Sequence, residues 1–214
     1  EGRDAGGEPR LHFVRLLTWV PGVPLALVKP HSEALLVNLG RAVGEMDRAL
    51  ADFEHPAMHR PFPWDLTRTL ETVSPLLEGS SSTFGTSSTS TFSTSGTSCT
   101  PSTTRLDILS RVLSHFRDLV EPTLPSLRRQ VIHDDWNDYN VLVRGQRLQK
   151  GGAQEVTPVT VVDFGDMVHS VVVADLAVAA AYALLDKPDP VGAAISVSRP
   201  AAMAGHPPTC GGDG

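Results

Sequence analysis

Between Ser32 and Phe53 the apolar residues recur every three or four positions, as Leu36, Leu39, Val43, Met46 and Leu50. This period places them on one face of a helix, so the pattern predicts an amphipathic helix. Ser32 is a suitable N-cap, because its hydroxyl can accept a hydrogen bond from a backbone N–H group of the first turn. The next stretch, residues 55–64, holds three prolines and two histidines and is expected to form an ordered loop.

A second run with the same period begins at Arg105 and continues to Val120, and two prolines at positions 122 and 125 close it. A third stretch, Val171–Leu185, is apolar nearly all round apart from Asp175. Such a stretch predicts a buried helix, and its 15 residues are too few to span a bilayer.

Short runs of branched and aromatic residues predict four strands. They lie at His12–Trp19, Val131–His133, Asn140–Val143 and Pro158–Val162. The polar, glycine-containing segment Arg144–Thr157 separates the last two strands and is expected to be the loop of a hairpin. Helices combined with a few short strands indicate the α+β class.

Three parts of the chain lack this patterning. Residues 1–11 are polar and Gly-rich, residues 79–104 are nearly all Ser and Thr, and residues 191–214 are rich in Pro, Gly and Ala. We expect a disordered start, insert and tail, because these parts bury too little apolar surface to offset the entropy lost on ordering. The insert is either a tolerated surface segment or a phosphorylated regulatory loop. The ordered parts are then residues 12–78 and 105–190.

The 214-residue chain is 41% hydrophobic and 20% charged, with a formal net charge of −6. The apolar share is enough for a sizeable core, and the acidic balance argues against a nucleic-acid partner. No apolar run is long enough to span a membrane. Cys99 and Cys210 lack metal-ligand or disulfide-framework spacing, which fits a reducing, cytoplasmic compartment. The chain shows no signal-peptide pattern, and because it begins at Glu1 rather than Met we expect a processed chain or, in preference, a piece of a longer protein.

The strongest chemical signal lies between the predicted strands. Residues 133–140 read His-Asp-Asp-Trp-Asn-Asp-Tyr-Asn and fit the pattern H-x-D-x-x-x-x-N, and the sequence Asp-Phe-Gly begins 23 residues after Asn140. Phosphoryl transfer from a nucleoside triphosphate needs a carboxylate that accepts the proton of the attacking hydroxyl. It also needs oxygen ligands that hold Mg²⁺ against the phosphates. This chemistry assigns Asp135 as the base, and Asn140 and Asp163 as the Mg²⁺ ligands.

Asp and Asn are also common in surface turns, which is the alternative explanation of these residues. That explanation does not account for two motifs in this order with strands and a hairpin between them. We therefore expect the hairpin to bring the loop that ends at Asn140 beside Asp163.

The two motifs resemble those of the aminoglycoside phosphotransferase-like family of small-molecule kinases, to which choline kinases belong. The similarity covers roughly residues 12–190 without the Ser/Thr insert, and it is carried by Val14–Gly22, Ile132–Val143 and Val162–Met167. Softer segments, namely Gly40–Asp47, His55–Pro56 and Phe62–Leu66, are most similar to the hydroxylysine kinase subfamily. The resemblance implies a protein-kinase-like fold, with a mainly helical C-terminal lobe around a short catalytic β-hairpin.

The resemblance also implies roles for residues around the base and the metal ligands. The backbone of Leu17, Thr18 and Trp19, next to the hinge, is expected to contact the base of the nucleotide. The carboxylate of Asp175 is expected to brace the catalytic loop by hydrogen bonds, and His133 is expected to hold the loop through the backbone.

Two further carboxylates are candidates for substrate recognition. Asp138 and Asp166 are expected near the ammonium group of an amine-bearing substrate. A solvated acidic rim is an equal alternative for both.

Two departures from the family stand out. The family usually has Gly where Asp134 stands, and a second negative charge beside the base raises the pKa of a carboxyl, which either harms or tunes catalysis. The chain also begins near the hinge strand, with no glycine-rich loop and no phosphate-pairing Lys before it, since Lys29 follows the hinge. We therefore expect the N-terminal lobe to be largely absent and the chain alone to be a poor catalyst.

By resemblance, the function is transfer of the γ-phosphoryl group of GTP or ATP, with Mg²⁺, to the hydroxyl of a small amine-bearing substrate. The subfamily points to 5-hydroxylysine. A homoserine, choline or aminoglycoside kinase, or a non-catalytic truncated remnant, is the alternative. The resemblance also allows fusion to an aminotransferase module in a full-length protein.

Overall fold

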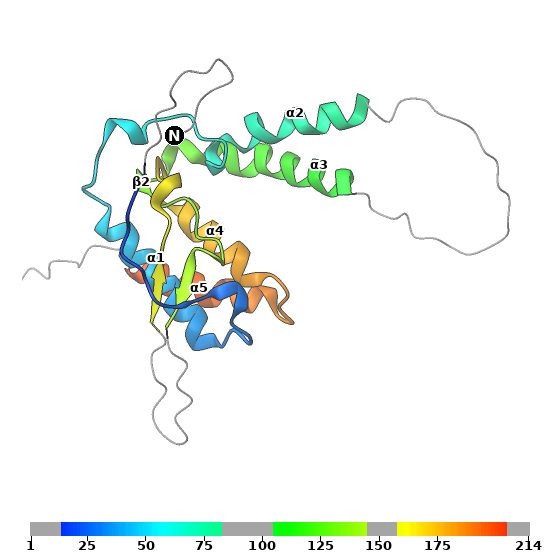
Figure 1. The fold of residues 1–214 in the computed structure, drawn as a ribbon. Coiled ribbons are helices and arrows are strands. Elements are labelled where there is room, and N and C mark those ends of the chain that lie inside the picture. The colour runs from blue at the N-terminus through cyan, green and yellow to red at the C-terminus, as the bar shows by residue number, and fades with distance from the viewer. Residues whose placement is uncertain (1–13, 83–104, 145–157, 205–214) are drawn as a thin grey trace, which may run out of the picture.

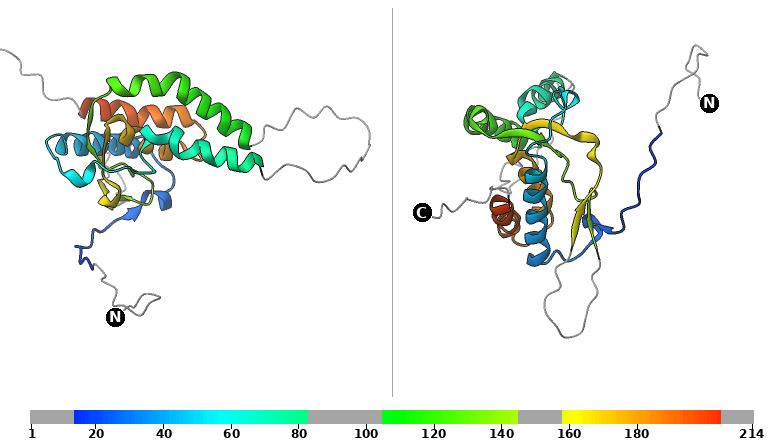
Figure 2. Two further views of the ribbon diagram at one scale, coloured as in Figure 1. Left: turned by 90° about the horizontal axis from the view of Figure 1, so that it is seen from above. Right: turned by 90° about the vertical axis from the view of Figure 1, so that its left-hand side faces the viewer.

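The computed structural model describes residues 14–82, 105–144 and 158–204, and its body is built from a small sheet and three helices. The helices are α1 (Glu33–Ala49), α4 (Val173–Leu184) and α5 (Pro190–Ala204). They lie on one side of the sheet, and α1 stands between the sheet and α5 (Figure 2). This helix-rich arrangement agrees with the predicted α+β class.

Two antiparallel sheets carry the short strands. The first has the order β1 (Val23–Pro24), β3 (Val141–Val143) and β4 (Val159–Val161). The hairpin of β3 and β4 pairs Val141 with Val161, as the sequence predicted, and its loop at 145–157 lies outside the described residues.

The second sheet pairs β2 (Arg129–Ile132) with β5 (Val168–Val171). Of these two strands, only β2 was predicted from the sequence. β5 places Val168 opposite Ile132, the residue directly before the predicted catalytic loop.

Helix α1 follows its predicted pattern closely. Ser32 caps it, because its hydroxyl accepts a hydrogen bond from the Leu35 N–H group at 3.2 Å. Leu39 and Val43 on the predicted face are fully buried in the main core. Gly40 lies at the closest approach to α5, since a Cβ atom there would stand 1.9 Å from the Val197 carbonyl oxygen. A side chain at position 40 would therefore push the two helices apart.

Helix α5 contradicts the predicted disordered tail, because residues 190–204 are helical and only 205–214 lie outside the described residues. Ala193, Val197 and Ala201 are buried at a spacing of four, against the other helices of the body. The prediction was wrong because small side chains and Pro200 give a weak hydrophobic signal. Close packing against Gly40 nevertheless favours small residues here.

Helix α4 is buried along one side only. Ala179 and Ala183 are fully buried, whereas Val173 is 49% exposed and Leu184 is 37% exposed. The predicted burial on all sides is therefore wrong for the outer face. No helix in the described ranges is long and apolar enough to cross a membrane.

Two helices form an arm that projects from the body (Figure 1). α2 (Thr69–Ser82) and α3 (Arg105–His115) lie side by side and antiparallel. The predicted second helix continues from α3 through a π-helical turn, and a 3-10 helix with both prolines ends it. The predicted disordered insert starts too early, because α2 extends to Ser82, and residues 83–104 lie outside the described residues.

The predicted hinge strand at His12–Trp19 is wrong where the structure describes it. Residues 14–22 form no regular element, and Leu16 is fully exposed. In the described part of the chain, no strand pairs with them, and β1 begins only at Val23. Branched and aromatic residues favour a strand only where a neighbouring strand accepts their hydrogen bonds.

Candidate active site

The predicted catalytic loop, residues 133–140, connects β2 to β3 above the first turn of α4. Asp175, in that turn, is fully buried. One carboxylate oxygen of Asp175 accepts a hydrogen bond from the backbone N–H group of His133 at 3.0 Å, and the other accepts one from Asp134 at 2.7 Å. The start of the loop is therefore held from below by one side chain.

Asp135 is held by two asparagines of the same loop. Its carboxylate accepts hydrogen bonds from the amide nitrogen of Asn137 at 2.8 Å and from that of Asn140 at 2.6 Å. The Asn137 side-chain oxygen in turn accepts from the backbone N–H groups of Tyr139 and Asn140. This network fixes the orientation of the Asp135 carboxylate. It also makes the Asn140 amide oxygen the atom that can face a cation.

The second motif lies directly beside this loop. The N–H group of Val162 donates to the Asn140 carbonyl at 2.9 Å, which places Asp163 next to Asn140. The His133 ring lies within hydrogen-bond distance of the Val162 carbonyl, at 3.2 Å, and contacts the Phe164 ring edge-on, with ring centres 4.9 Å apart. The structure therefore brings together Asp135, Asn140 and Asp163.

Asp163 has a left-handed backbone conformation, with φ 65°. Its carboxylate accepts from the Gly165 N–H group at 3.2 Å and is exposed to solvent. A non-glycine residue at positive φ is uncommon and marks a special position of the chain. Here the conformation turns the chain from β4 into the 3-10 turn Phe164–Asp166 and leaves the carboxylate at the surface of the site.

Asp134, which stands where the family usually has Gly, also has positive φ, at 66°. Its side chain is only 4% exposed, and both carboxylate oxygens are buried without a hydrogen-bond partner. Burial raises the pKa of Asp134 to about 8, and the charges of Asp175, Asp65, Asp166 and Asp135 raise it further in the same direction. A carboxyl group in this environment is stable only when it is protonated or when a cation binds beside it.

Asp47 of α1 forms a second buried acidic pair with Asp175. Burial and the neighbouring Asp175 charge raise the pKa of Asp47 to about 8. Burial also raises the pKa of Asp175, whereas the backbone hydrogen bonds from Asp134 and His133 lower it. The negative charge therefore belongs on Asp175, where backbone donors meet it, and the proton belongs on Asp47.

A cavity of about 400 Å³ opens at the catalytic loop. Its lining residues are acidic or aromatic, with one aliphatic side chain: Trp64, Asp134, Asp135, Asp166, Val178 and Tyr182. Of the two carboxylates predicted to meet a substrate, Asp166 lines this cavity. Asp138 is not among the lining residues, and its backbone carbonyl accepts from the Ala26 N–H group.

The sequence reasoning missed Trp64 and Tyr182 as parts of this cavity. Trp64 is placed by its neighbour Asp65, whose buried carboxylate accepts from the Ser170 hydroxyl at 2.6 Å and from the Thr67 N–H group at 2.9 Å. The segment Phe62–Leu66 had a family-like sequence, which was the available signal. Tyr182 lies on α4 seven residues after Asp175, and nothing in the sequence distinguished it from core residues.

Leu17, Thr18 and Trp19 are not brought to this cavity. Leu17 is 79% exposed and Trp19 is 84% exposed, in the irregular segment before β1. That segment meets the sheet where the Arg144 side chain donates to the Pro21 carbonyl at 3.1 Å. Because β1 is antiparallel to β3, this contact lies at the end of β3 opposite Asn140.

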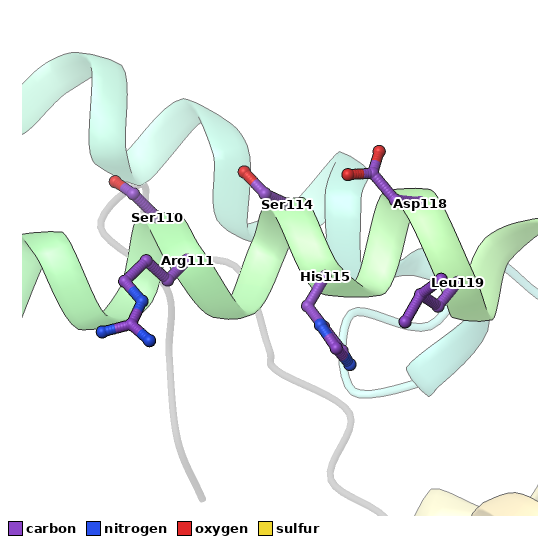
Figure 3. A pocket seen from close by; sticks show the side chains of 6 residues that line it. All are labelled: Ser110, Arg111, Ser114, His115, Asp118 and Leu119. Atoms are coloured by element: carbon purple, nitrogen blue, oxygen red, sulfur yellow. The ribbon is translucent and has the colours of Figure 1, made fainter.

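A hollow of about 460 Å³ lies along α3 and the π-helical turn, away from the catalytic loop (Figure 3). All of its lining side chains come from this one stretch of helix: Ser110, Arg111, Ser114, His115, Asp118 and Leu119. It contains none of the predicted site residues, so the candidate site is the cavity at Asp135.

An Asp–Asn loop beside an aspartate at the end of an antiparallel strand, on a helix-rich body, defines a kinase-like phosphotransferase. The model of the phosphotransferase enzyme family matches residues 2–199, and the chain belongs to this family. Its relatives include hydroxylysine kinases from Bos taurus and Mus musculus, which are 30% and 29% identical over 193 residues. The hydroxylysine kinase of Xenopus laevis is 28% identical over 196 residues.

The match to the bovine protein covers 88% of this chain but 45% of that relative. The corresponding shares for the Xenopus laevis protein are 89% and 46%. The chain therefore spans about half the length of the curated relatives it matches. No solved structure matches it significantly.

Proposed function

We propose that this chain carries the catalytic part of a small-molecule kinase that transfers the γ-phosphoryl group of GTP or ATP to the hydroxyl of 5-hydroxylysine. The observation that carries the proposal is the placement of Asp135 and Asn140 beside Asp163, through the hydrogen bond between Val162 and Asn140. The relatives named hydroxylysine kinase support the choice of substrate.

In this proposal Asp135 is the base. It orients the substrate hydroxyl and accepts its proton as the oxygen attacks the γ-phosphorus, while the bond from the γ-phosphorus to the bridging oxygen breaks and the nucleoside diphosphate leaves. The hydrogen bonds from Asn137 and Asn140 hold the carboxylate in one orientation without needing the substrate. Because phosphoryl transfer depends mainly on positioning, this preorganisation favours the reaction.

Asn140 and Asp163 fit Mg²⁺. Both present oxygen ligands, and the backbone hydrogen bond between Asn140 and Val162 keeps them adjacent. Hard dications prefer carboxylate and amide oxygens. A bound Mg²⁺ supplies positive charge that offsets the charge on the phosphates. In the same proposal His133 and Asp175 support the catalytic loop. The backbone of Leu17, Thr18 and Trp19 is the proposed contact of the nucleotide base.

The cavity suits a substrate with an ammonium group. Asp166 supplies negative charge, and Asp134, whose raised pKa keeps it largely protonated near neutral pH, ionises when a cation lies beside it. Trp64 and Tyr182 supply aromatic faces that attract cations. The carboxylate oxygens of Asp134 are buried and unpartnered, so an ammonium ion there would gain a strong, charge-assisted hydrogen bond. The cavity volume, about 400 Å³, lies in the usual range for small-molecule sites.

The test is a phosphoryl-transfer assay with the complete gene product that contains this chain. Mg²⁺–GTP and Mg²⁺–ATP are offered with 5-hydroxylysine, homoserine, choline or an aminoglycoside. We expect transfer to 5-hydroxylysine, and its loss in Asp135→Asn. The control is Asp118→Asn, which changes an exposed carboxylate on the arm to the same amide. Preferred transfer to another acceptor would contradict the substrate, and activity in Asp135→Asn would contradict the site.

A further inference from the structure

Three metal-ligating side chains gather outside the candidate active site. Glu54 and His59 come from the loop after α1, and His169 comes from β5. One ligand atom from each lies within 4.8 Å of the other two. We propose that Glu54, His59 and His169 bind a divalent transition-metal ion, with Zn²⁺ as the best fit.

The distances are close to those that a metal site needs. The His59 Nε2 atom lies 2.5 Å from a Glu54 carboxylate oxygen, and the rings of His59 and His169 are stacked with centres 4.4 Å apart. Zinc bonds of about 2.0–2.2 Å in tetrahedral geometry place ligand atoms about 3.3 Å apart. The side chains therefore need to move by about 1 Å, which rotation of the exposed Glu54 and His59 side chains around the half-buried His169 can supply.

Both sides of the cluster are already held in place by other contacts. His169 lies in the ladder of β5 and β2, opposite Val131. On the other side, a short 3-10 turn at Pro56–Met58 shapes the loop, and the His55 ring caps it by accepting from the Ala57 N–H group.

Arg60 fastens this loop to the segment before β5. Its guanidinium donates to the Gly165 carbonyl at 2.9 Å and to the Met167 carbonyl at 3.3 Å. The fold has thus brought His59 and His169 together although they are 110 positions apart in sequence. Binding of a metal ion therefore does not have to supply the entropy lost on closing that loop.

The ligand types select the metal. Two imidazole nitrogens with one carboxylate oxygen suit Zn²⁺ and its neighbours, whereas Mg²⁺ and Ca²⁺ prefer oxygen ligands alone. Three protein ligands leave a fourth position for water, and Glu54 and His59 are exposed enough to admit it. The site is therefore distinct in chemistry from the proposed Mg²⁺ site at Asn140 and Asp163.

An exposed ion pair between Glu54 and His59 is the simpler explanation of part of the cluster. Such pairs contribute little stability in water, and they give no reason for a second imidazole. The stacked His169 ring is the feature that the ion pair leaves unexplained, because the contact between Glu54 and His59 does not require it. A metal ion uses all three side chains and would link the loop before Arg60 to β5.

The test is isothermal titration calorimetry, in which ZnCl₂ is added to the full chain and the heat of binding is measured. Mg²⁺ is present in excess throughout. We expect saturable binding of one Zn²⁺, and at least about a tenfold loss of affinity in His59→Ala and in His169→Ala. The matched control is His115→Ala, which removes an exposed imidazole on α3 and should bind like the wild type. Co²⁺ should give a spectrum without a thiolate charge-transfer band, which excludes Cys99 and Cys210 as ligands.

Glu54→Gln is a milder variant, because an exposed carboxylate is exchanged for an amide of the same shape. Saturating Zn²⁺ should raise the melting temperature of the wild type by about 5 °C, and that of Glu54→Gln clearly less. The proposal is wrong if the wild type does not bind Zn²⁺, or if the histidine variants bind it as tightly as the control.

Discussion

The catalytic loop and the hinge residues Leu17, Thr18 and Trp19 were both assigned to the active site from sequence, and they differ sharply in structure. His133 is fully buried and its backbone N–H group is bonded to Asp175. Leu16 is fully exposed and Trp19 is 84% exposed, with no regular structure around them. The proposed base and the proposed metal ligands are thus positioned by contacts within the described residues. The proposed contact with the nucleotide base is not.

This difference separates two kinds of evidence for a site. Asp135, Asn140 and Asp163 are held by named hydrogen bonds that require no other part of a protein. For Leu17 the family resemblance alone supports a role. We therefore expect substitutions around the loop to have large effects on stability and chemistry, and substitutions in residues 14–22 to have small effects on stability.

The largest effect on stability is expected for Asp175→Ala. The substitution leaves the buried N–H groups of His133 and Asp134 without an acceptor, so the free energy of unfolding should fall by about 3 kcal/mol. Urea denaturation followed by circular dichroism measures it. Asp118→Asn is the control with unchanged stability, and an Asp175→Ala protein of wild-type stability would show that the loop is held by other contacts.

Asp134→Asn should separate substrate binding from folding. The amide keeps the shape and tolerates positive φ, but it removes the carboxyl group that the proposal expects to ionise beside the substrate ammonium. We expect KM for 5-hydroxylysine to rise about tenfold, with a smaller change in kcat, as for a binding interaction of about 1.4 kcal/mol. Asp134→Gly, the usual family residue, should behave alike. An unchanged KM in both variants would exclude Asp134 from substrate recognition.

The buried carboxyl groups of Asp47 and Asp175 under the catalytic loop predict that the free energy of unfolding falls as the pH rises above neutral. The pKa of Asp47 is raised to about 8 in the folded protein, so the native state holds a proton that the unfolded chain has already released above about pH 4. Stability is then lost as pH rises toward 8, and wild-type unfolding at pH 9 should cost about 2–3 kcal/mol less than at pH 6. Asp47→Asn should lose less stability over that range. Equal losses in both proteins would contradict the assignment of the proton.

The smallest effect is expected in residues 14–22. Replacing Leu16 and Trp19 together by Ser should change the free energy of unfolding by no more than about 0.5 kcal/mol, because both side chains are already in water. Leu39→Ala, in the core, is the contrast and should cost about 3 kcal/mol. A large loss in the double Ser variant would show that this segment packs on the body.

Local patterns were read correctly where the local sequence determines the structure. The period of α1 and its Ser32 cap, the prolines after α3 and the hairpin of β3 and β4 were all visible in the sequence. The spacing from Asn140 to Asp163 also predicted that the two motifs meet, because a hairpin places its two ends side by side.

The remaining features depend on contacts that no local pattern encodes. Helix α5 was missed because its packing against Gly40 relies on small side chains rather than a strong apolar stripe. The burial of Asp134 and the meeting of His59 with His169 arise from segments far apart in the chain. The prediction of a strand at His12–Trp19 was wrong for the same reason, because a strand requires a partner strand that the local sequence does not reveal.

The most direct measurement of the central claim compares Mg²⁺-dependent transfer to 5-hydroxylysine in the wild type and in Asp163→Asn, using the complete gene product. A neutral amide is a weaker ligand for Mg²⁺ and does not offset its charge, so we expect a loss of about a hundredfold or more. The exposed position of Asp163 should leave the melting temperature unchanged. Near-wild-type transfer by Asp163→Asn, with the same dependence on Mg²⁺, would contradict the account.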